Sequence, residues 1–241
     1  MKNNYLSILI LFAGGLLATG CIKDLETLPD KRAGLTVVNS FLDAEAVFHR
    51  LDMGRGLQQL NRGLGYRSID YYSVPSCENC RMEITALNGK KPLVDTSFVM
   101  ENNTYYTSFL FGSEMAPKHF LTIDSVPKNE KNPSEAAGLR FFNFAETTLP
   151  VTLNIGSAAP IPSFRNRPTE TPETGRESGD FVLTTDTGTH VLTIEDEQGN
   201  LLAKRTGVAL DRGDCLTVFL TGNNSESSPY YIGIVRHQGM N

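Results

Sequence analysis

The sequence predicts an all-β protein with two tandem immunoglobulin-like β-sandwich domains after a lipoprotein signal peptide. Val, Ile, Thr, Tyr and Phe recur in short runs, glycine and proline are plentiful, and long stretches of helical periodicity are absent. The chain also contains an internal repeat, and each copy has room for about seven short strands in roughly a hundred residues. That density of strands is typical of an immunoglobulin-like sandwich.

The first element, residues 1–20, has the layout of a signal peptide. A basic residue precedes a short apolar run over residues 5–17, and three small residues follow at 18–20. The run is shorter than the roughly 20 apolar residues that a membrane-spanning helix needs. The residues that end this segment resemble a lipobox, which predicts that Cys21 carries the lipid and becomes the mature N-terminus. An ordinary secretory signal is the alternative, and both readings predict export.

A short charged tether over residues 21–32 follows the cleavage site. Ile22 stands where an aspartate would hold a lipoprotein at the inner membrane, and residues 23–26 resemble the export tag of Bacteroidetes surface lipoproteins. We therefore expect attachment to the outer membrane through the N-terminal lipid, at the cell surface, with the periplasmic face as the alternative. Loss of Lys2 takes the net charge from −5 to −6, and the absence of a basic cluster argues against a nucleic-acid partner.

The internal repeat defines the two domains. Four ordered matches pair residues 33–39 with 137–143, 48–54 with 151–156, 82–89 with 192–199, and 106–112 with 216–222. The offset is 104 early and 110 late, so the second copy has gained six residues in between. We expect the first domain over 33–125, a polar linker over 126–136, and the second domain over 137–241.

The second copy shows its strands most clearly. They are expected near 139–144, 150–155, 180–185, 189–195, 200–208, 213–221 and 230–236. Within 189–195, His190, Leu192 and Ile194 share one face, which marks a half-buried strand with a histidine at the core edge. The stretch 157–179 holds Pro, Thr, Glu and Arg and almost no apolar residue, and it predicts a long polar loop that is functional or disordered.

The repeat opening at 139–143, the stretch 66–74, and the strand ends 107–112 and 217–222 resemble the family called domain of unknown function 4397. Members of that family are often duplicated and carried by bacterial envelope lipoproteins. The resemblance implies this architecture and this location, and it implies no chemistry. Thr36 departs from the family pattern because it stands where the opening arginine is expected.

Cys77 and Cys80 form the sharpest local motif of the mature chain. In an exported domain this spacing predicts a structural disulfide that clamps a turn. A redox pair is one alternative, although a strand and not a helix is expected next to the motif, and half of a zinc site is another, although no second cysteine pair exists. Cys80 aligns with His190 in the second copy. Cys215 aligns with Tyr105 and is expected to be a half-buried filler in a strand.

No catalytic group, metal site or cofactor site is predicted. The four histidines lie on separate predicted strands without metal-ligand spacing: His49, His119, His190 and His237. There is no Gly-x-Ser-x-Gly elbow and no glycine-rich phosphate loop. Carboxylates such as Asp95, Asp211 and Asp214 are scattered near turns, and a glycosidase pair among them remains the alternative.

Six of the tyrosines form adjacent pairs, at 71–72, 105–106 and 230–231. Neighbours on a strand point to opposite faces, so each pair is expected to place one ring inside and one outside. Outward rings could bind a sugar or a protein, whereas the plainer interpretation is that tyrosine is an ordinary strand former. The absence of Trp weakens the sugar interpretation. The candidate ligand contacts are Tyr71, Tyr105 and Tyr230, with Arg165 and Arg167 from the loop 157–179.

Residues 124–126, Asp-Ser-Val, resemble an acceptor for bacterial protein O-glycosylation, which makes Ser125 a candidate modification site. The function predicted from all of these observations is that of a non-enzymatic, surface-anchored lipoprotein that binds or adheres to glycan or protein ligands. A structural accessory subunit, paired with another envelope protein through a strand edge, is the alternative. A hydrolase is the third class.

Overall fold

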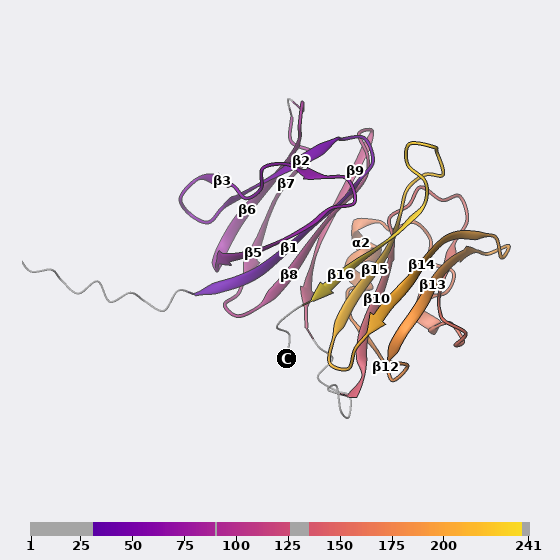
Figure 1. Ribbon diagram of the computed structural model, residues 1–241. Coiled ribbons are helices and arrows are strands. Elements are labelled where there is room, and N and C mark those ends of the chain that lie inside the picture. Colours follow the sequence, from indigo (N-terminus) through magenta and orange to yellow (C-terminus); the bar gives the residue numbers. More distant parts are fainter. Residues whose placement is uncertain (1–30, 90, 126–134, 238–241) are drawn as a thin grey trace, which may run out of the picture. The chain divides into compact units, whose positions relative to one another are not determined.

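The computed structural model describes residues 31–89, 91–125 and 135–237 (Figure 1). The predicted signal peptide, Cys21, and residues 126–134 of the predicted linker lie outside the described residues. From Arg32 onward the chain belongs to one compact unit. In the part of the chain that the structure describes, no helix has the length and apolar character to cross a membrane.

The first sandwich contains nine strands. They are β1 Arg32–Phe41, β2 Ala46–Asp52, β3 Leu57–Gln59, β4 Leu64–Gly65, β5 Ile69–Pro75, β6 Cys77–Ala86, β7 Val94–Met100, β8 Tyr105–Ser113 and β9 Ala116–Asp124. One sheet has the order β5-β1-β8-β9 and the other has the order β3-β2-β6-β7, with β4 also paired to β2.

The second sandwich repeats this plan. Its elements are β10 Ala137–Asn143, β11 Val151–Ile155, the 3₁₀ helix η2 Pro162–Phe164, α2 Pro172–Glu177, β12 Val182–Thr184, β13 Gly188–Asp196, β14 Leu201–Leu210, β15 Cys215–Thr221 and β16 Tyr231–His237. The sheets have the orders β12-β10-β15-β16 and β11-β13-β14. The all-β class with two sandwiches is confirmed, and all seven strands expected in the second copy are present.

The central pairing of each sandwich has the same register in both copies. Strand β1 runs parallel to β8 with Gly34 opposite Tyr105, and β10 runs parallel to β15 with Gly138 opposite Cys215. The sequence alignment of Cys215 with Tyr105 therefore agrees with the strand register. A parallel central pair differs from the purely antiparallel sheets of an immunoglobulin sandwich.

Each repeat glycine makes room for the side chain across from it. A Cβ on Gly34 would lie 2.4 Å from the Tyr105 ring, and a Cβ on Gly138 would lie 2.6 Å from the Cys215 sulfur. Both distances are below ordinary van der Waals contact. The Ala-Gly-Leu opening of each repeat is thus explained by packing against the parallel neighbour.

The two sandwiches share a third hydrophobic core, in addition to one core of their own each. Its buried members come from the β1-β8-β9 side and the β10-β15-β16 side: Val38, Phe109, Phe111, Phe120, Phe142, Phe144, Phe219 and Val235. The rings of Phe109 and Phe142 lie 5.1 Å apart, and those of Phe111 and Phe144 lie 4.6 Å apart. Aromatic pairs at this spacing stabilise each other beyond the area that they bury.

This shared core explains the burial of the central strands. Residues 106–112 of β8 are all buried, and so is every residue of β10 and β15. One face of each strand packs into its own sandwich and the other face packs into the shared core, so even polar residues of these strands, such as Ser108 and Arg140, are buried. The two sandwiches are therefore packed against each other through a common core and are not joined by the linker alone.

A polar contact flanks the shared core at the loop before β5. The Tyr66 hydroxyl lies 3.1 Å from the Thr221 hydroxyl and 3.0 Å from that of Ser228. The next residue, Arg67, stacks its guanidinium 4.8 Å from the ring centroids of both Tyr66 and Tyr231. Cation–π contacts of this kind add to the attachment between the sandwiches.

The stretch 157–179, which was expected to be a functional or a disordered loop, is an ordered segment that packs against both sandwiches. Phe164 is buried in the second core, and Thr171 caps α2 in a capping box with Thr174. Helix α2 contacts β9 of the first sandwich, where a Cβ on Gly175 would lie 2.3 Å from the Phe120 ring. The polar composition of this stretch did not indicate that it is packed, because only a few of its residues make the anchoring contacts.

Helix α2 also accounts for the six residues gained by the second copy. Arg67 donates its backbone N–H to the Asn39 carbonyl, and Glu170 donates its own to the Asn143 carbonyl, both at 2.8 Å. These two equivalent residues are 103 positions apart in the sequence, close to the early offset of 104 between the repeats. After the helix, Val182 lies opposite Leu139 of β10, as Tyr72 lies opposite Leu35 of β1. Val182 and Tyr72 are 110 positions apart, which is the late offset between the repeats. The insertion is therefore the six-residue α2 that fills the space beside the first sandwich.

Candidate functional site

A groove of about 670 Å³ lies between the two sandwiches. Tyr71, Tyr72 and Tyr105 line it from the first sandwich, and Arg205 and Arg236 line it from the second. We call this cavity the tyrosine groove. Its volume is in the range of ligand pockets in proteins.

The tyrosine pairs alternate as the sequence predicts. Tyr71 is 54% exposed and Tyr105 is 38% exposed, whereas their neighbours Tyr72 and Tyr106 pack against the first core. Both outward rings line the groove, although they belong to different strands, β5 and β8. The fold thus brings together two of the three predicted ring contacts.

The prediction for the third ring, Tyr230, is wrong. Tyr230 packs against the second core, and its neighbour Tyr231 is the exposed member at 37%. The reason is the register of β16, since Ile232 is buried in the core and residues two apart share a face. Tyr231 lies beside the groove residue Arg205, with the guanidinium 5.9 Å from the ring centroid.

Tyr71 connects the two walls of the groove. Burial raises the pKa of its hydroxyl, while a backbone hydrogen bond from Arg236 and the charge of that arginine oppose the rise. Tyr71 of β5 and Arg236 of β16 thus line the same groove from the two sandwiches. The position of the Tyr71 ring depends on the packing of both sandwiches, not on its own strand alone.

The deep part of the groove meets a buried polar network around Asp124. Arg140 Nη2 lies 2.7 Å from Asp124 Oδ1, His237 Nδ1 lies 3.2 Å from Oδ2, and the Thr107 hydroxyl donates to Oδ2 at 2.6 Å. Burial by itself raises the pKa of Asp124, but the Arg140 charge and the His237 hydrogen bond lower it well below its usual value. The carboxylate is ionised and fully engaged within the protein.

The two arginines of the groove are held by backbone oxygens. Arg205 Nη1 donates to the carbonyl of Ile232 at 2.8 Å, and Arg236 Nη2 donates to the carbonyl of Ala209 at 2.8 Å. Arg236 also pairs with Asp214 at 3.1 Å, where both side chains are partly exposed. Sequence reasoning missed both arginines, because nothing near them in the chain distinguishes them from other charged strand residues.

The predicted arginine contacts of the loop 157–179 lie elsewhere. Arg167 forms an ion pair with the buried Glu170, and Arg165 donates to the carbonyl of Pro160 at 3.2 Å. Neither lines the tyrosine groove. Arg167 is engaged in holding its own loop, so the structure assigns it a structural contact.

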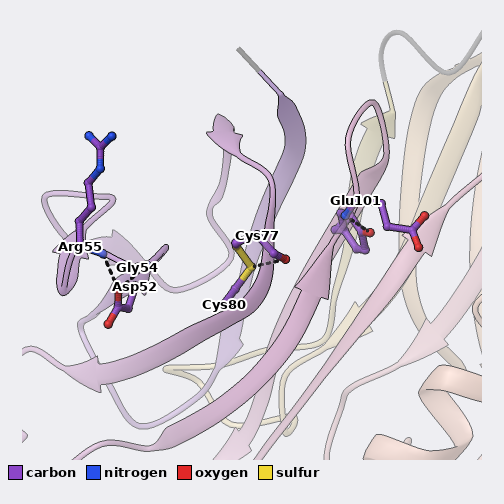
Figure 2. The surroundings of a disulfide bond; sticks show 7 residues. Asp52, Gly54, Arg55, Cys77, Cys80 and Glu101 are labelled. Carbon is purple, nitrogen blue, oxygen red and sulfur yellow. Dashed lines mark hydrogen bonds between the residues drawn. A yellow bond between two sulfur atoms is a disulfide. The ribbon is translucent and has the colours of Figure 1, made fainter. Parts of the chain in front are cut away.

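Cys77 and Cys80 form a disulfide on β6, with the Cα atoms 5.6 Å apart (Figure 2). The expectation of a clamped turn is wrong in detail, because both residues lie within the strand. The bond spans an irregularity where the register between β6 and β7 shifts. In the second sandwich the register shifts next to His190, the residue aligned with Cys80. The two irregularities differ, because the extra residue lies in β6 between Cys77 and Cys80 in the first sandwich, whereas in the second it lies in β14, opposite His190 and Leu192.

Three further predicted residues take ordinary positions. His190 is half-buried, with Asp186 at 3.7 Å. Cys215 is buried more deeply than expected, and burial raises the pKa of its thiol to about 11, so it stays protonated and unreactive at neutral pH. Ser125 is exposed directly after β9, while Asp124 of the same motif is buried.

The groove offers little for acid–base catalysis. Asp124 is the single carboxylate among its lining residues, and a glycosidase needs a pair. Among the residues that the structure describes, no three His, Cys, Asp or Glu side chains gather as metal ligands would. What the arrangement can do is stack and hydrogen-bond a ligand.

No protein-family model matches the chain, and no curated protein shows significant similarity to it. The resemblance to domain of unknown function 4397 therefore remains an interpretation of the motifs. Similar solved structures include CBMbc, of family CBM26, from Eubacterium rectale Amy13K in complex with maltoheptaose. Identity is 7% and the TM-score is 0.28, over 86% of this chain and 97% of that chain.

Two more structures are similar at the same level. The multi-modular glycogen-degrading pneumococcal virulence factor SpuA has 14% identity and a TM-score of 0.25, and the match covers 86% of this chain and 22% of that one. The tip fimbrial protein Mfa3 from Porphyromonas gingivalis has 8% identity and a TM-score of 0.22, over 87% and 100% of the two chains. All three likenesses are too distant to carry an argument about function.

Proposed function

We propose that the protein is a non-enzymatic, lipid-anchored binding module of the bacterial envelope that holds a glycan in the tyrosine groove. The observation that carries the proposal is the convergence of Tyr71 and Tyr105 from one sandwich with Arg205 and Arg236 from the other around one cavity. Binding pockets commonly combine apolar and aromatic walls with a few placed polar groups.

A sugar suits this lining because it has two kinds of surface. Its C–H faces pack on flat aromatic rings, and its hydroxyls need hydrogen-bond partners around the edge. Tyr71 and Tyr105 supply rings with polar ends, and the arginines supply donors. Rings held by their own strands lose little conformational freedom on binding, which favours affinity.

The lipid anchor predicted at Cys21 fits the same role. If Cys21 carries lipid, the sandwiches stand outside the membrane on a short tether, where a groove can reach polymers of the cell surface. Protease or an impermeant amine reagent applied to intact cells tests the location. Labelling of intact cells supports the surface role, and protection until the cells are permeabilised contradicts it.

The binding test uses the purified mature protein on a panel of immobilised glycans. We expect at least one class of glycan to bind, and Tyr71→Ala and Tyr105→Ala to weaken that binding at least about tenfold. Tyr71→Phe should retain most of the binding, because the ring remains. Met115→Ala is the control, since Met115 is 93% exposed and lies outside the groove.

One observation favours the alternative of a structural subunit. Strand β7 lies at the edge of its sheet, pairs with β6 on one side, and exposes 53% of Val99. Such an edge can accept a strand from a partner. If the protein binds no glycan and co-purifies with a stoichiometric envelope protein, and Val99→Lys breaks that complex, the subunit role replaces the binding role.

A further inference from the structure

Charge is distributed unevenly between the groove and the rest of the chain. The whole chain has a net charge of −5, yet the groove is lined by two arginines and one carboxylate. That carboxylate, Asp124, is already paired with Arg140 and bonded to His237. The groove therefore presents uncompensated positive charge in an acidic protein.

Arg205 is the source of most of that charge. Among the described residues, no carboxylate lies within ion-pair distance of its guanidinium, in contrast to the partners of Arg50, Arg81 and Arg236. Its Nη1 is fixed by the Ile232 carbonyl, which orients the planar group. A half-buried guanidinium that is held on one side and open on the other is suited to a bidentate anion.

Arg236 lies on the same side of the cavity. Its ion pair with Asp214 is half exposed, with side-chain exposures of 42% and 45%. Exposed pairs of this kind contribute little and are exchanged readily. Tyr71 and Arg236 both line the groove, and the charge of Arg236 opposes the rise that burial causes in the pKa of the Tyr71 hydroxyl.

We infer that the tyrosine groove selects acidic glycans, and that Arg205, with Arg236, binds their carboxylate or sulfate groups. The inference rests on the proposed function and narrows its ligand class. Neutral sugars would meet the same rings but would leave the open guanidinium edge without its best partner. Hydrogen bonds to a charged group are about twice as strong as neutral ones, so the acidic ligand gains the difference.

The test compares matched probes on the mature protein. Short oligogalacturonates and their methyl esters share one backbone and form a charged and a neutral probe. Sulfated and desulfated chondroitin oligosaccharides form a second pair, whose members both keep the uronate carboxylate and differ in sulfate. We expect the more highly charged member of at least one pair to bind about tenfold more tightly, with a preference that declines as salt is raised.

The variants assign the preference to its residues. Arg205→Ala should reduce binding of the charged probe about tenfold and binding of the neutral probe by a smaller factor, whereas Arg205→Lys should restore part of the loss. Arg55→Ala is the matched control, because Arg55 is exposed on a turn of the first sandwich. Thermal unfolding of each variant establishes that it is folded.

The outcomes separate the two proposals. Equal binding of charged and neutral probes, lost in Tyr71→Ala, overturns the acidic preference and retains the glycan-binding function. A charged preference that survives in both Arg205→Ala and Arg236→Ala overturns the assignment to these residues. Failure to bind any glycan of the broad panel overturns the proposed function and the acidic preference together.

Discussion

Arg140 and Asp124 form an ion pair between the two sandwiches, at 2.7 Å, with each side chain 1% exposed. Strand β9 of the first sandwich ends at Asp124, and Arg140 lies in β10, the first strand of the second. In the strand registers Asp124 is equivalent to His237, since each faces the first residue of the preceding strand. Equivalent residues of the two copies thus meet at the interface, 3.2 Å apart.

The Arg140–Asp124 pair predicts a large loss of stability when one partner is removed. Arg140→Met should lower the free energy of unfolding by about 3–5 kcal/mol, because it leaves a buried carboxylate without its counter-charge. Arg140→Met with Asp124→Leu should recover much of that loss. Urea unfolding at neutral pH measures both. Arg81→Met, which breaks an exposed pair with Asp95, is the control and should leave stability unchanged. An equal loss of stability in Arg140→Met and Arg81→Met would contradict the prediction.

The shared phenylalanine core predicts that the sandwiches unfold together. Phe142→Ala should lower the free energy of unfolding by about 3–5 kcal/mol and shift one single calorimetric transition. A fragment ending at residue 125 would expose the rings of Phe109, Phe111 and Phe120, and it should aggregate or remain unfolded. Two separate transitions, of which Phe142→Ala moves only one, would show that the domains fold independently.

Two buried histidines of the first sandwich predict loss of stability in acid. Burial lowers the pKa of His49 to about 3 and that of His119 to about 4. The unfolded chain has a histidine pKa of about 6.5 and so binds more protons than the folded state in this range. The stabilisation is therefore complete above about pH 6.5 and is lost as the pH falls toward about 4.

Urea midpoints measured between pH 7.5 and pH 4.5 check this sign. We expect a decline that begins near the unfolded pKa of about 6.5 and a flatter decline in His49→Gln. A midpoint that rises with acid, or a slope unaltered by replacement of either histidine, would contradict the assignment. Ionised Asp124 adds a loss of the same sign at lower pH, because its pKa is also depressed.

Gly34 predicts a coupling between backbone packing and ligand binding. A Cβ at this position would lie 2.4 Å from the Tyr105 ring, so Gly34→Ala must displace the ring in the groove. We expect a loss of about 1–3 kcal/mol of stability and weaker glycan binding. Gly65→Ala is the matched control, because its nearest neighbour would lie at an ordinary 3.5 Å. Unchanged binding in Gly34→Ala would show that Tyr105 does not contact the ligand.

The disulfide predicts a modest effect of reduction. The loop that it closes is short, so its loss should cost about 2 kcal/mol and leave the protein folded. Chemical unfolding with and without a thiol reductant measures the difference. The double variant Cys77→Ala and Cys80→Ala should be insensitive to the reductant, whereas a remaining response would implicate Cys21 or Cys215.

Much of the architecture can be predicted from the sequence because it depends on local rules. Alternation within 189–195 marks a strand at any position in a fold, and the repeated Ala-Gly-Leu opening marks a second copy of the first strand. Alternation also predicts that one ring of each tyrosine pair points outward, and this holds in all three pairs. The choice of Tyr230 as the outward ring of its pair was wrong, because the strand register, which turns and packing determine, decides which of two neighbours faces the core.

The tertiary structure alone decided what the outward rings face. Arg205 and Arg236 lie more than 130 residues from Tyr71 in the sequence, and their meeting depends on the shared phenylalanine core. The same core explains why the runs around Phe109 and Phe142 are buried on both faces, which packing within a single sandwich would not require. Local sequence patterns indicate whether a residue is buried or exposed, but they do not indicate which surfaces pack against each other. The tyrosine groove forms only when the two sandwiches pack together, so the sequence alone could not predict it.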